Sequence, residues 1–241
     1  PMEGDTAIKK SVGPHKASED VVIGYDPGSW GGDCEKDGSI TLGAGENKTC
    51  TITNDDVAPK LTLVKNVVND DGGNALPDDF ALIIDGNPAT SGIGYDVNAN
   101  TPLVINETPV DGYEFVEITG DLKCPDVLGG TITLDEGDDI TCTIKNDDIA
   151  PTITLVKDVT NDDGGQAGVN DFGLTIGDTS VDSGQTLFVV ANTDYALDEG
   201  GLPGYSFVSM TGDGCPITLG GTVNLDEGEN IACTIINNDI A

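Results

Sequence analysis

Three lysines of this chain stand where the surrounding pattern calls for buried apolar residues. Lys65 alternates with Leu63 and Val67, so the three side chains share one face of an extended strand. A buried ammonium group is costly unless it is paired, and burial favours the neutral amine, which is a nucleophile. The same alternation surrounds two further lysines, Lys157 (between Leu155 and Val159) and Lys10 (between Ile8 and Val12).

An asparagine and a glutamate accompany each lysine at positions that also alternate with the expected core residues. The asparagines follow a cysteine and an isoleucine at alternate positions near the end of each repeat, at Asn54, Asn146 and Asn237. The glutamates stand five residues before a Gly-Tyr pair, at Glu107, Glu199 and Glu19. A carboxylic acid held beside an amine and an amide can move protons between them. Each repeat therefore turns three polar side chains toward its predicted core.

The order of these residues resembles that of the CnaB/SpaA-type prealbumin-like domains, the Ig-like β-sandwich repeats of bacterial surface adhesins and pilus shafts. The resemblance rests on L-x-K, E-x-x-x-x-G-Y and I-x-N, and it covers residues 60–148 and 152–240 well and 6–56 in part. In that family the lysine and the asparagine condense to an intramolecular isopeptide bond, assisted by the glutamate. The resemblance implies the bonds Lys65–Asn146, Lys157–Asn237 and Lys10–Asn54, assisted by Glu107, Glu199 and Glu19.

Two readings without a covalent bond account for the same pattern. One is a buried Lys–Glu ion pair with the asparagine hydrogen-bonded beside it, and the other is a lysine that snorkels from an edge strand. The first repeat also departs from the other two. Lys10 and Glu19 are 9 residues apart there, against 42 from Lys65 to Glu107.

Acidic residues gather after the first and the last strand of each repeat. If these strands run parallel, as in the resembled family, their carboxylates meet at the junction with the next domain. Oxygen ligands in such number suit Ca²⁺, and the junction N-D-D-I-A-P has a weaker resemblance to the calcium linkers of cadherins. The alternative is that N-D-D-G-G is only a hairpin turn, because Asn, Asp and Gly tolerate positive φ. The candidate calcium ligands are Asp55, Asp56, Asp70, Asp71, Asp147, Asp148, Asp162, Asp163 and Asp239.

The six cysteines occur two per repeat, 16, 18 and 18 residues apart. Paired cysteines at a near-constant spacing, without a C-x-x-C motif or nearby histidines, indicate disulfides within each repeat. Disulfides place the protein outside the reducing cytoplasm, so we expect it to be extracellular or at the cell surface. The expected pairs are Cys34–Cys50, Cys124–Cys142 and Cys215–Cys233.

Internal repetition sets the domain organisation. The segment 61–73 returns at 153–165, and 129–151 returns at 220–241, with a looser copy at 39–59. A period of about 90 residues is the size of a small β-sandwich. Short alternating segments between Gly, Pro, Asn and Asp predict an all-β fold of tandem small β-sandwich domains. The predicted domains are 1–58, a truncated repeat with first and last strands near 6–12 and 48–54, then 59–150 and 151–241.

The charge and composition exclude several classes of function. The formal net charge is −33, and the 10 basic residues are all lysines. Nucleic acid binding needs clustered cations and guanidinium groups, so we expect no nucleic acid partner. No apolar run approaches the length of a membrane span. The sequence offers no catalytic constellation either, and we expect no enzyme.

These features together predict a structural subunit of an extracellular filament or cell-surface stalk. We expect copies of the chain to assemble head-to-tail, with a neighbour donating a strand to the truncated first repeat. The alternative is a calcium-dependent adhesin or a glycan- or ligand-binding surface module. Ordered polymers from the purified protein favour the first function, and saturable binding by monomers favours the second.

Overall fold

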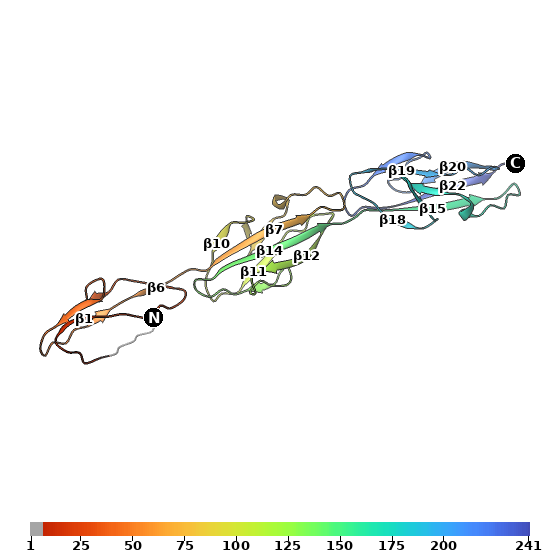
Figure 1. The fold of residues 1–241 in the computed structure, drawn as a ribbon. Coiled ribbons are helices and arrows are strands. Elements are labelled where there is room, and N and C mark those ends of the chain that lie inside the picture. The colour runs from red at the N-terminus through yellow and green to blue at the C-terminus, as the bar shows by residue number, and fades with distance from the viewer. Residues whose placement is uncertain (1–6) are drawn as a thin grey trace.

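The computed structural model describes residues 7–241 and shows three bodies in a row (Figure 1). Within these residues the only helical elements are two single 3-10 turns, Pro77–Asp79 and Val169–Asp171. The prediction of an all-β chain is therefore confirmed. No helix among residues 7–241 has the length and apolar character that crossing a bilayer requires. Residues 1–6, which include the first residue of the strand predicted near 6–12, lie outside the described part.

The second repeat, residues 60–148, folds into two four-stranded sheets that face each other. The first sheet has the order β10-β7-β14-β12 and the second the order β13-β11-β8-β9. The strands of the first sheet are β7 (Lys60–Val68), β10 (Gly94–Asp96), β12 (Tyr113–Gly120) and β14 (Asp139–Asp148). Those of the second are β8 (Leu82–Ile84), β9 (Asn87–Ala89), β11 (Leu103–Glu107) and β13 (Thr131–Ile132).

The third repeat, residues 152–239, has the same topology. Its sheets have the orders β18-β15-β22-β20 and β17-β16-β19-β21. The first contains β15 (Thr152–Thr160), β18 (Thr186–Phe188), β20 (Tyr205–Thr211) and β22 (Asn230–Asp239). The second contains β16 (Leu174–Ile176), β17 (Thr179–Val181), β19 (Asp194–Glu199) and β21 (Gly221–Asn224).

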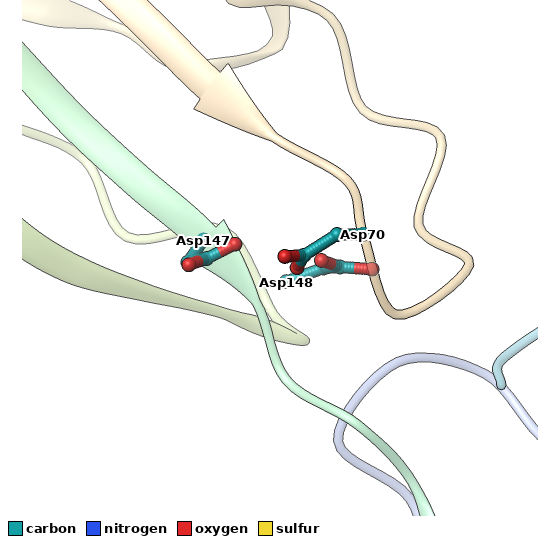
Figure 2. Close-up of side chains that lie close together, drawn as sticks. All are labelled: Asp70, Asp147 and Asp148. Carbon is teal, nitrogen blue, oxygen red and sulfur yellow. The ribbon is translucent and has the colours of Figure 1, made fainter. Parts of the chain in front are cut away.

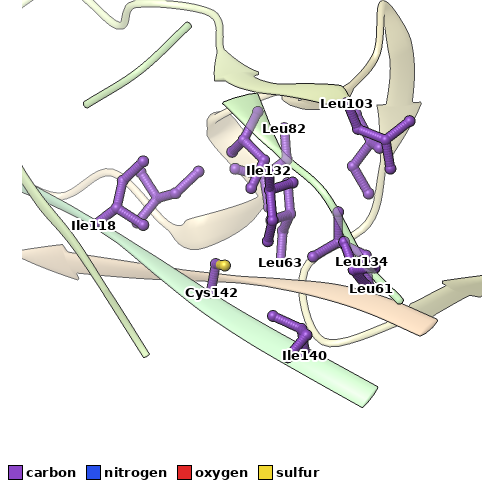
Figure 3. Close-up of a cluster of buried hydrophobic side chains, with 12 residues drawn as sticks. Leu61, Leu63, Leu82, Leu103, Ile118, Ile132, Leu134, Ile140 and Cys142 are labelled. Atoms are coloured by element: carbon purple, nitrogen blue, oxygen red, sulfur yellow. The ribbon is translucent and has the colours of Figure 1, made fainter. Parts of the chain in front are cut away.

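The first and last strands of each complete repeat lie side by side and parallel. In the second repeat Leu63 of β7 stands opposite Cys142 of β14, and Lys65 stands opposite Ile144. Strand β15 pairs with β22 in the same register. Alternate side chains of both strands enter the core between the sheets, where Leu61, Leu63 and Cys142 are fully buried (Figure 3). Every second residue faces the core, as the alternation predicts.

The N-terminal body consists of three two-stranded antiparallel pairs. They are β1 (Gly13–Lys16) with β4 (Ser39–Leu42), β2 (Tyr25–Pro27) with β6 (Asn54–Asp56), and β3 (Gly31–Gly32) with β5 (Cys50–Thr51). The prediction of a first strand near 6–12 is wrong, because residues 7–12 belong to no strand. The alternation of Ile8, Lys10 and Val12 has no sheet to pack on, and all three side chains are exposed.

The register of these pairs shows which part of a repeat the N-terminal body represents. Tyr25 opposes Asp56 as Tyr113 opposes Asp148 in the second repeat. The pairing of β1 with β4 likewise reproduces that of β11 with β13. Residues 13–56 are therefore the counterpart of 101–148, the second half of a repeat. Residues 7–56 contain no counterpart of the first half, whereas the sequence suggested that only strands between a first strand and Glu19 were lacking.

Successive bodies are joined by the same backbone hydrogen bonds. In the second joint the Ile149 N–H donates to the Gly112 carbonyl at 2.9 Å, and the Gly228 N–H donates to the Ile149 carbonyl at 2.7 Å. Val57, Gly24 and Gly137 make the equivalent bonds at 2.8 Å in the first joint. One linker residue thus ties the end of one body to a turn of the next, which stiffens the row.

In both joints a glycine of one body packs against a turn of the next repeat. A Cβ atom at Gly112 would lie 2.6 Å from the Cβ of Glu227, whereas one at Gly204, the counterpart in the third repeat, would meet nothing within 4 Å. Both glycines have positive φ, +79° and +86°. Both positions therefore require a left-handed backbone, but only Gly112 packs against a neighbouring domain.

We predict that Gly112→Ala opens the joint between the second and third repeats, because the methyl group collides with Glu227. The substitution should change the maximum dimension in small-angle X-ray scattering. Gly204→Ala is the matched control, since it carries the same left-handed strain of about 1–2 kcal/mol without the collision. Equal scattering changes in both variants would contradict this account of the joint.

Candidate functional site

The core of the second repeat contains a lysine, a glutamate and an asparagine in direct contact. The Lys65 ammonium Nζ lies 2.6 Å from Glu107 Oε2 and 2.6 Å from Asn146 Oδ1. The three residues are 5%, 4% and 2% exposed. They come from β7, β11 and β14, so the site bridges both sheets of the sandwich. The structure thus brings together the three side chains that the sequence singled out in this repeat.

The third repeat holds the same trio with a different hydrogen-bond pattern. Lys157 Nζ donates to Asn237 Oδ1 at 2.9 Å and lies 3.3 Å from Glu199 Oε2. The Asn237 side-chain amide donates to Glu199 Oε1 at 2.5 Å. The glutamate therefore touches both the amine and the amide nitrogen, the two groups between which a proton would have to move.

Burial makes both lysines better nucleophiles. Loss of solvent lowers the pKa of Lys65, and the hydrogen bond and charge of Glu107 counteract this shift only in part. Burial likewise lowers the pKa of Lys157 against the opposing charge of Glu199. A lowered pKa raises the fraction of neutral amine, the form that attacks a carbonyl carbon.

An aromatic ring completes each site, and the sequence analysis did not identify it. Lys65 Nζ lies 4.0 Å from the ring centre of Phe80, and Lys157 Nζ lies 4.5 Å from that of Phe172. Both rings are buried and exclude water from the amine. The signal was present in the sequence as a repeated Asp-Phe pair, at 79–80 and 171–172, ahead of each second strand.

The first repeat brings two of its three predicted residues together and leaves the third apart. The Asn54 side-chain amide donates to Glu19 Oε2 at 3.1 Å, and both residues are exposed. Within residues 7–241, no hydrogen bond or ion pair joins Lys10 to either of them. The pairing Lys10–Asn54 is therefore not supported, because Lys10 precedes β1 and the strand that would carry a counterpart of Lys65 belongs to the missing half.

Six of the nine aspartates proposed as calcium ligands gather in two clusters. One consists of Asp70, Asp147 and Asp148 (Figure 2), and the other of Asp162, Asp163 and Asp239; within each, carboxylate oxygens lie within 4.8 Å of one another. The parallel first and last strands bring them together, as expected. Burial raises the pKa of Asp147, and the charge of Asp70 adds to that shift.

Backbone amides already satisfy the most buried carboxylate of each cluster. Asp148 accepts hydrogen bonds from the N–H groups of Asp71 at 3.0 Å and Gly73 at 2.6 Å. Asp239 accepts the equivalent bonds from the third-repeat loop. Burial raises the pKa of Asp239, but these amides outweigh it and the pKa is lowered. The N-D-D-G-G loop is thus held by a carboxylate, whether or not a cation joins it.

The remaining predicted ligands lie apart from these clusters. Asp55 and Asp56 are exposed on β6, and no acidic cluster forms around them among residues 7–241. Their repeat lacks the first half, which carries the N-D-D-G-G loop in the other two. Asp71 contributes its backbone N–H to Asp148, and the pKa of its carboxyl is raised by burial and by the charges of Asp148 and Asp70.

The three predicted disulfides are present. They join Cys34 to Cys50, Cys124 to Cys142 and Cys215 to Cys233. Cys142 and Cys233 lie on the last strand of each complete repeat and are fully buried. In the complete repeats the bridge therefore ties the loop that follows β12 or β20 to the last strand.

Comparison with known proteins identifies the repeats. A family model described as a SpaA-type prealbumin-like fold domain matches residues 56–144 and 148–235. No curated protein sequence matches the chain significantly. Among solved structures, a major pilin from Streptococcus pyogenes is 14% identical over 77% of this chain and 100% of the pilin, with a TM-score of 0.30.

Two further solved structures are similar to the chain. The major pilin T3.2 from Streptococcus pyogenes is 12% identical over 93% of this chain and 94% of its own, with a TM-score of 0.32. The Bacillus anthracis TIE protein is 14% identical over 95% of this chain and 50% of its own, with a TM-score of 0.39.

We predict that Lys65→Ala destabilises the second repeat by about 3–5 kcal/mol relative to a chain in which no Lys65–Asn146 bond has formed, because Glu107 is left as an unpaired buried carboxylate. Urea unfolding combined with hydrogen exchange of the β7 and β14 amides would measure the loss. Lys60→Ala is the control on the same strand. Its side chain is 47% exposed and pairs with Asp96, so it should cost less than about 1 kcal/mol. Similar losses in both variants would refute the paired-charge account.

Proposed function

Because the chain belongs to the family of SpaA-type prealbumin-like fold domains, we propose that it is a structural subunit of an extracellular filament or cell-surface stalk, with domains that meet near residues 58 and 150. The observation that carries the proposal is the buried contact among Lys65, Glu107 and Asn146, which repeats in the third domain. The uniform joints support it, since a row of domains tied by equivalent bonds suits a load-bearing stalk. Three disulfides fit an oxidising, extracellular location.

We propose that each complete domain forms its own isopeptide bond, Lys65–Asn146 and Lys157–Asn237. The neutral lysine Nζ attacks the asparagine Cγ, the Cγ–Nδ2 bond breaks and ammonia leaves. The glutamate takes a proton from Nζ and delivers it to the departing nitrogen, so it ends in the state in which it began. The folded core supplies the proximity, and neither a cofactor nor a second enzyme is needed. Glu199 touches both nitrogens, which supports this role.

The position of the bond suits a protein under tension. The chain enters the second domain at the start of β7 and leaves at the end of β14, two parallel neighbours. A bond from Lys65 to Asn146 links these strands directly. Force then passes from one linker through a few residues to the next, and residues 66–145 carry none of it. The domain therefore extends little when pulled.

Assembly of copies head-to-tail remains part of the proposal, and the joints indicate how it could occur. The third repeat ends in one half of a joint, since the Ile240 N–H donates to the Gly204 carbonyl at 2.9 Å. Residues 43–47 of the first repeat contain the other half, a turn around Gly45 with the hydrogen bonds seen at Gly137 and Gly228. The two halves of the joint can therefore meet between two copies of the chain. Such a head-to-tail contact does not close on itself, so further copies can extend the row.

The isopeptide proposal predicts an intact mass, after disulfide reduction, that is lower by one ammonia for each of the two bonds. Peptide mapping should recover Lys65 linked to Asn146 and Lys157 linked to Asn237. Asn146→Ala should restore one ammonia, whereas Asn106→Ala, a change on the neighbouring β11, should restore none. A mass equal to that of the unmodified chain would refute self-crosslinking.

We further propose that Ca²⁺ binds at the two aspartate clusters and stiffens the row. The support is the convergence of three carboxylates within 4.8 Å and the net charge of −33, which a divalent cation would offset.

Chelation should lower the melting temperature, because a ligand that binds only the folded state stabilises it by mass action. Asp70→Asn should reduce that response, and Asp55→Asn should leave it unchanged, since Asp55 lies outside both clusters. If chelation in the absence of magnesium leaves the melting temperature unchanged, calcium binding at these clusters is refuted. The backbone amides then hold these carboxylates without a cation.

A further inference from the structure

The N-terminal body presents a sheet edge that the complete repeats cover. In the second repeat β14 pairs with β12 on one side and with β7 on the other. Its counterparts β5 and β6 pair only with β3 and β2. The edge along residues 50–56 therefore has unpaired backbone groups where a parallel strand would lie, and such an edge is a template for strand addition.

The same body contains half of a core. No hydrophobic side chain among residues 7–58 is buried. Four positions that are buried in the second repeat are only partly covered here. The pairs are Trp30 for Ile118, Ile40 for Ile132, Leu42 for Leu134 and Ile52 for Ile144. In the second repeat Leu61, Leu63, Leu82 and Ile84 pack on these positions, and all four belong to the first half. The apolar positions left partly exposed here are therefore those that the first half covers in the second repeat.

A hollow of about 300 Å³ opens at this unfinished core. It is lined by apolar side chains, among them Val21, Val22 and Ile52, and by the hydrogen-bonded pair Glu19 and Asn54. In the complete repeats a lysine from the first strand contacts the equivalent glutamate and asparagine. The hollow thus holds two of the three reacting groups and has room for the third.

We propose that residues 13–56 form a receptor for the first half of a prealbumin-like domain, and that its strand lysine bonds covalently to Asn54. The occupant is a segment with the pattern of residues 59–100, in which apolar residues alternate up to the lysine. The proposal rests on the isopeptide chemistry proposed above. The incoming Nζ attacks Asn54 Cγ, the Cγ–Nδ2 bond of Asn54 breaks, ammonia leaves, and Glu19 relays the proton.

The register fixes where the incoming strand lies. In the second repeat Lys65 stands opposite Ile144, so a lysine on a strand docked along residues 50–56 would stand opposite Ile52, which lines the hollow. Docking would also bury Glu19 and Asn54, which are exposed without it. In the complete repeats burial lowers the pKa of the lysine and so favours the neutral amine. The segment must come from outside residues 7–241, because the first halves at 60–98 and 152–190 are already folded into their own domains.

The test adds a synthetic peptide with the sequence of residues 59–100 to the full chain and measures the intact mass. We expect an adduct equal to the sum of both partners less one ammonia, with the peptide's Lys65 mapped to Asn54. A second experiment fuses another copy of residues 59–100 directly before Gly13. The fusion holds this segment next to the hollow at a high effective concentration. It should lose one ammonia more than the unfused chain.

Matched variants separate docking from general reactivity. Asn54→Ala and a Lys65→Arg peptide should each abolish the adduct, and Glu19→Gln should slow its formation. Glu35→Gln, a change at an exposed side chain of the same body that does not line the hollow, should leave it unchanged. If neither the peptide nor the fusion produces the additional loss while the chain itself lacks two ammonia molecules, the receptor proposal is overturned and self-crosslinking stands. If the chain lacks none, the proposed function fails first.

Discussion

The parallel pairing of the first strand with the last is the constraint on which the rest of each complete domain depends. It places a lysine of β7 beside an asparagine of β14 although they are 81 residues apart in sequence. The same pairing delivers the N-D-D-G-G loop to the aspartates at the end of β14. Parallel neighbours cannot be joined by a tight turn. All the remaining strands of the domain therefore belong to the connection between the first strand and the last.

A buried ammonium group beside a buried carboxylate is a costly way to fill a core. Removing the two ions from water opposes folding, and their attraction offsets this only when the geometry is good and the remaining groups are satisfied. Lys65 meets that condition through Glu107, Asn146 and the ring of Phe80. The arrangement is consistent with isopeptide formation, because conversion of the amine to an amide would remove the charge that burial disfavours.

The N-terminal body shows how the same sequence pattern behaves without its partner half. It keeps the disulfide, the strand pairs and the contact between Glu19 and Asn54. It lacks buried apolar side chains among residues 7–58, because a β-sandwich core is made by two sheets and neither is complete here. The geometry of the site therefore survives locally, whereas its burial requires the whole domain.

The sequence by itself determined the all-β fold, the cysteine pairs and the residue types of the site, because alternation, spacing and repetition are local or periodic signals. It could place Lys65, Glu107 and Asn146 on core-facing positions, since a strand has a period of two residues. Only the tertiary structure showed that Lys10 is exposed and lies outside any strand. Its alternation with Ile8 and Val12 copies the local pattern, but membership in a sheet depends on a partner strand, and residues 7–12 have none. Phe80 and the backbone donors to Asp148 also required the fold, because they reach the site from distant loops.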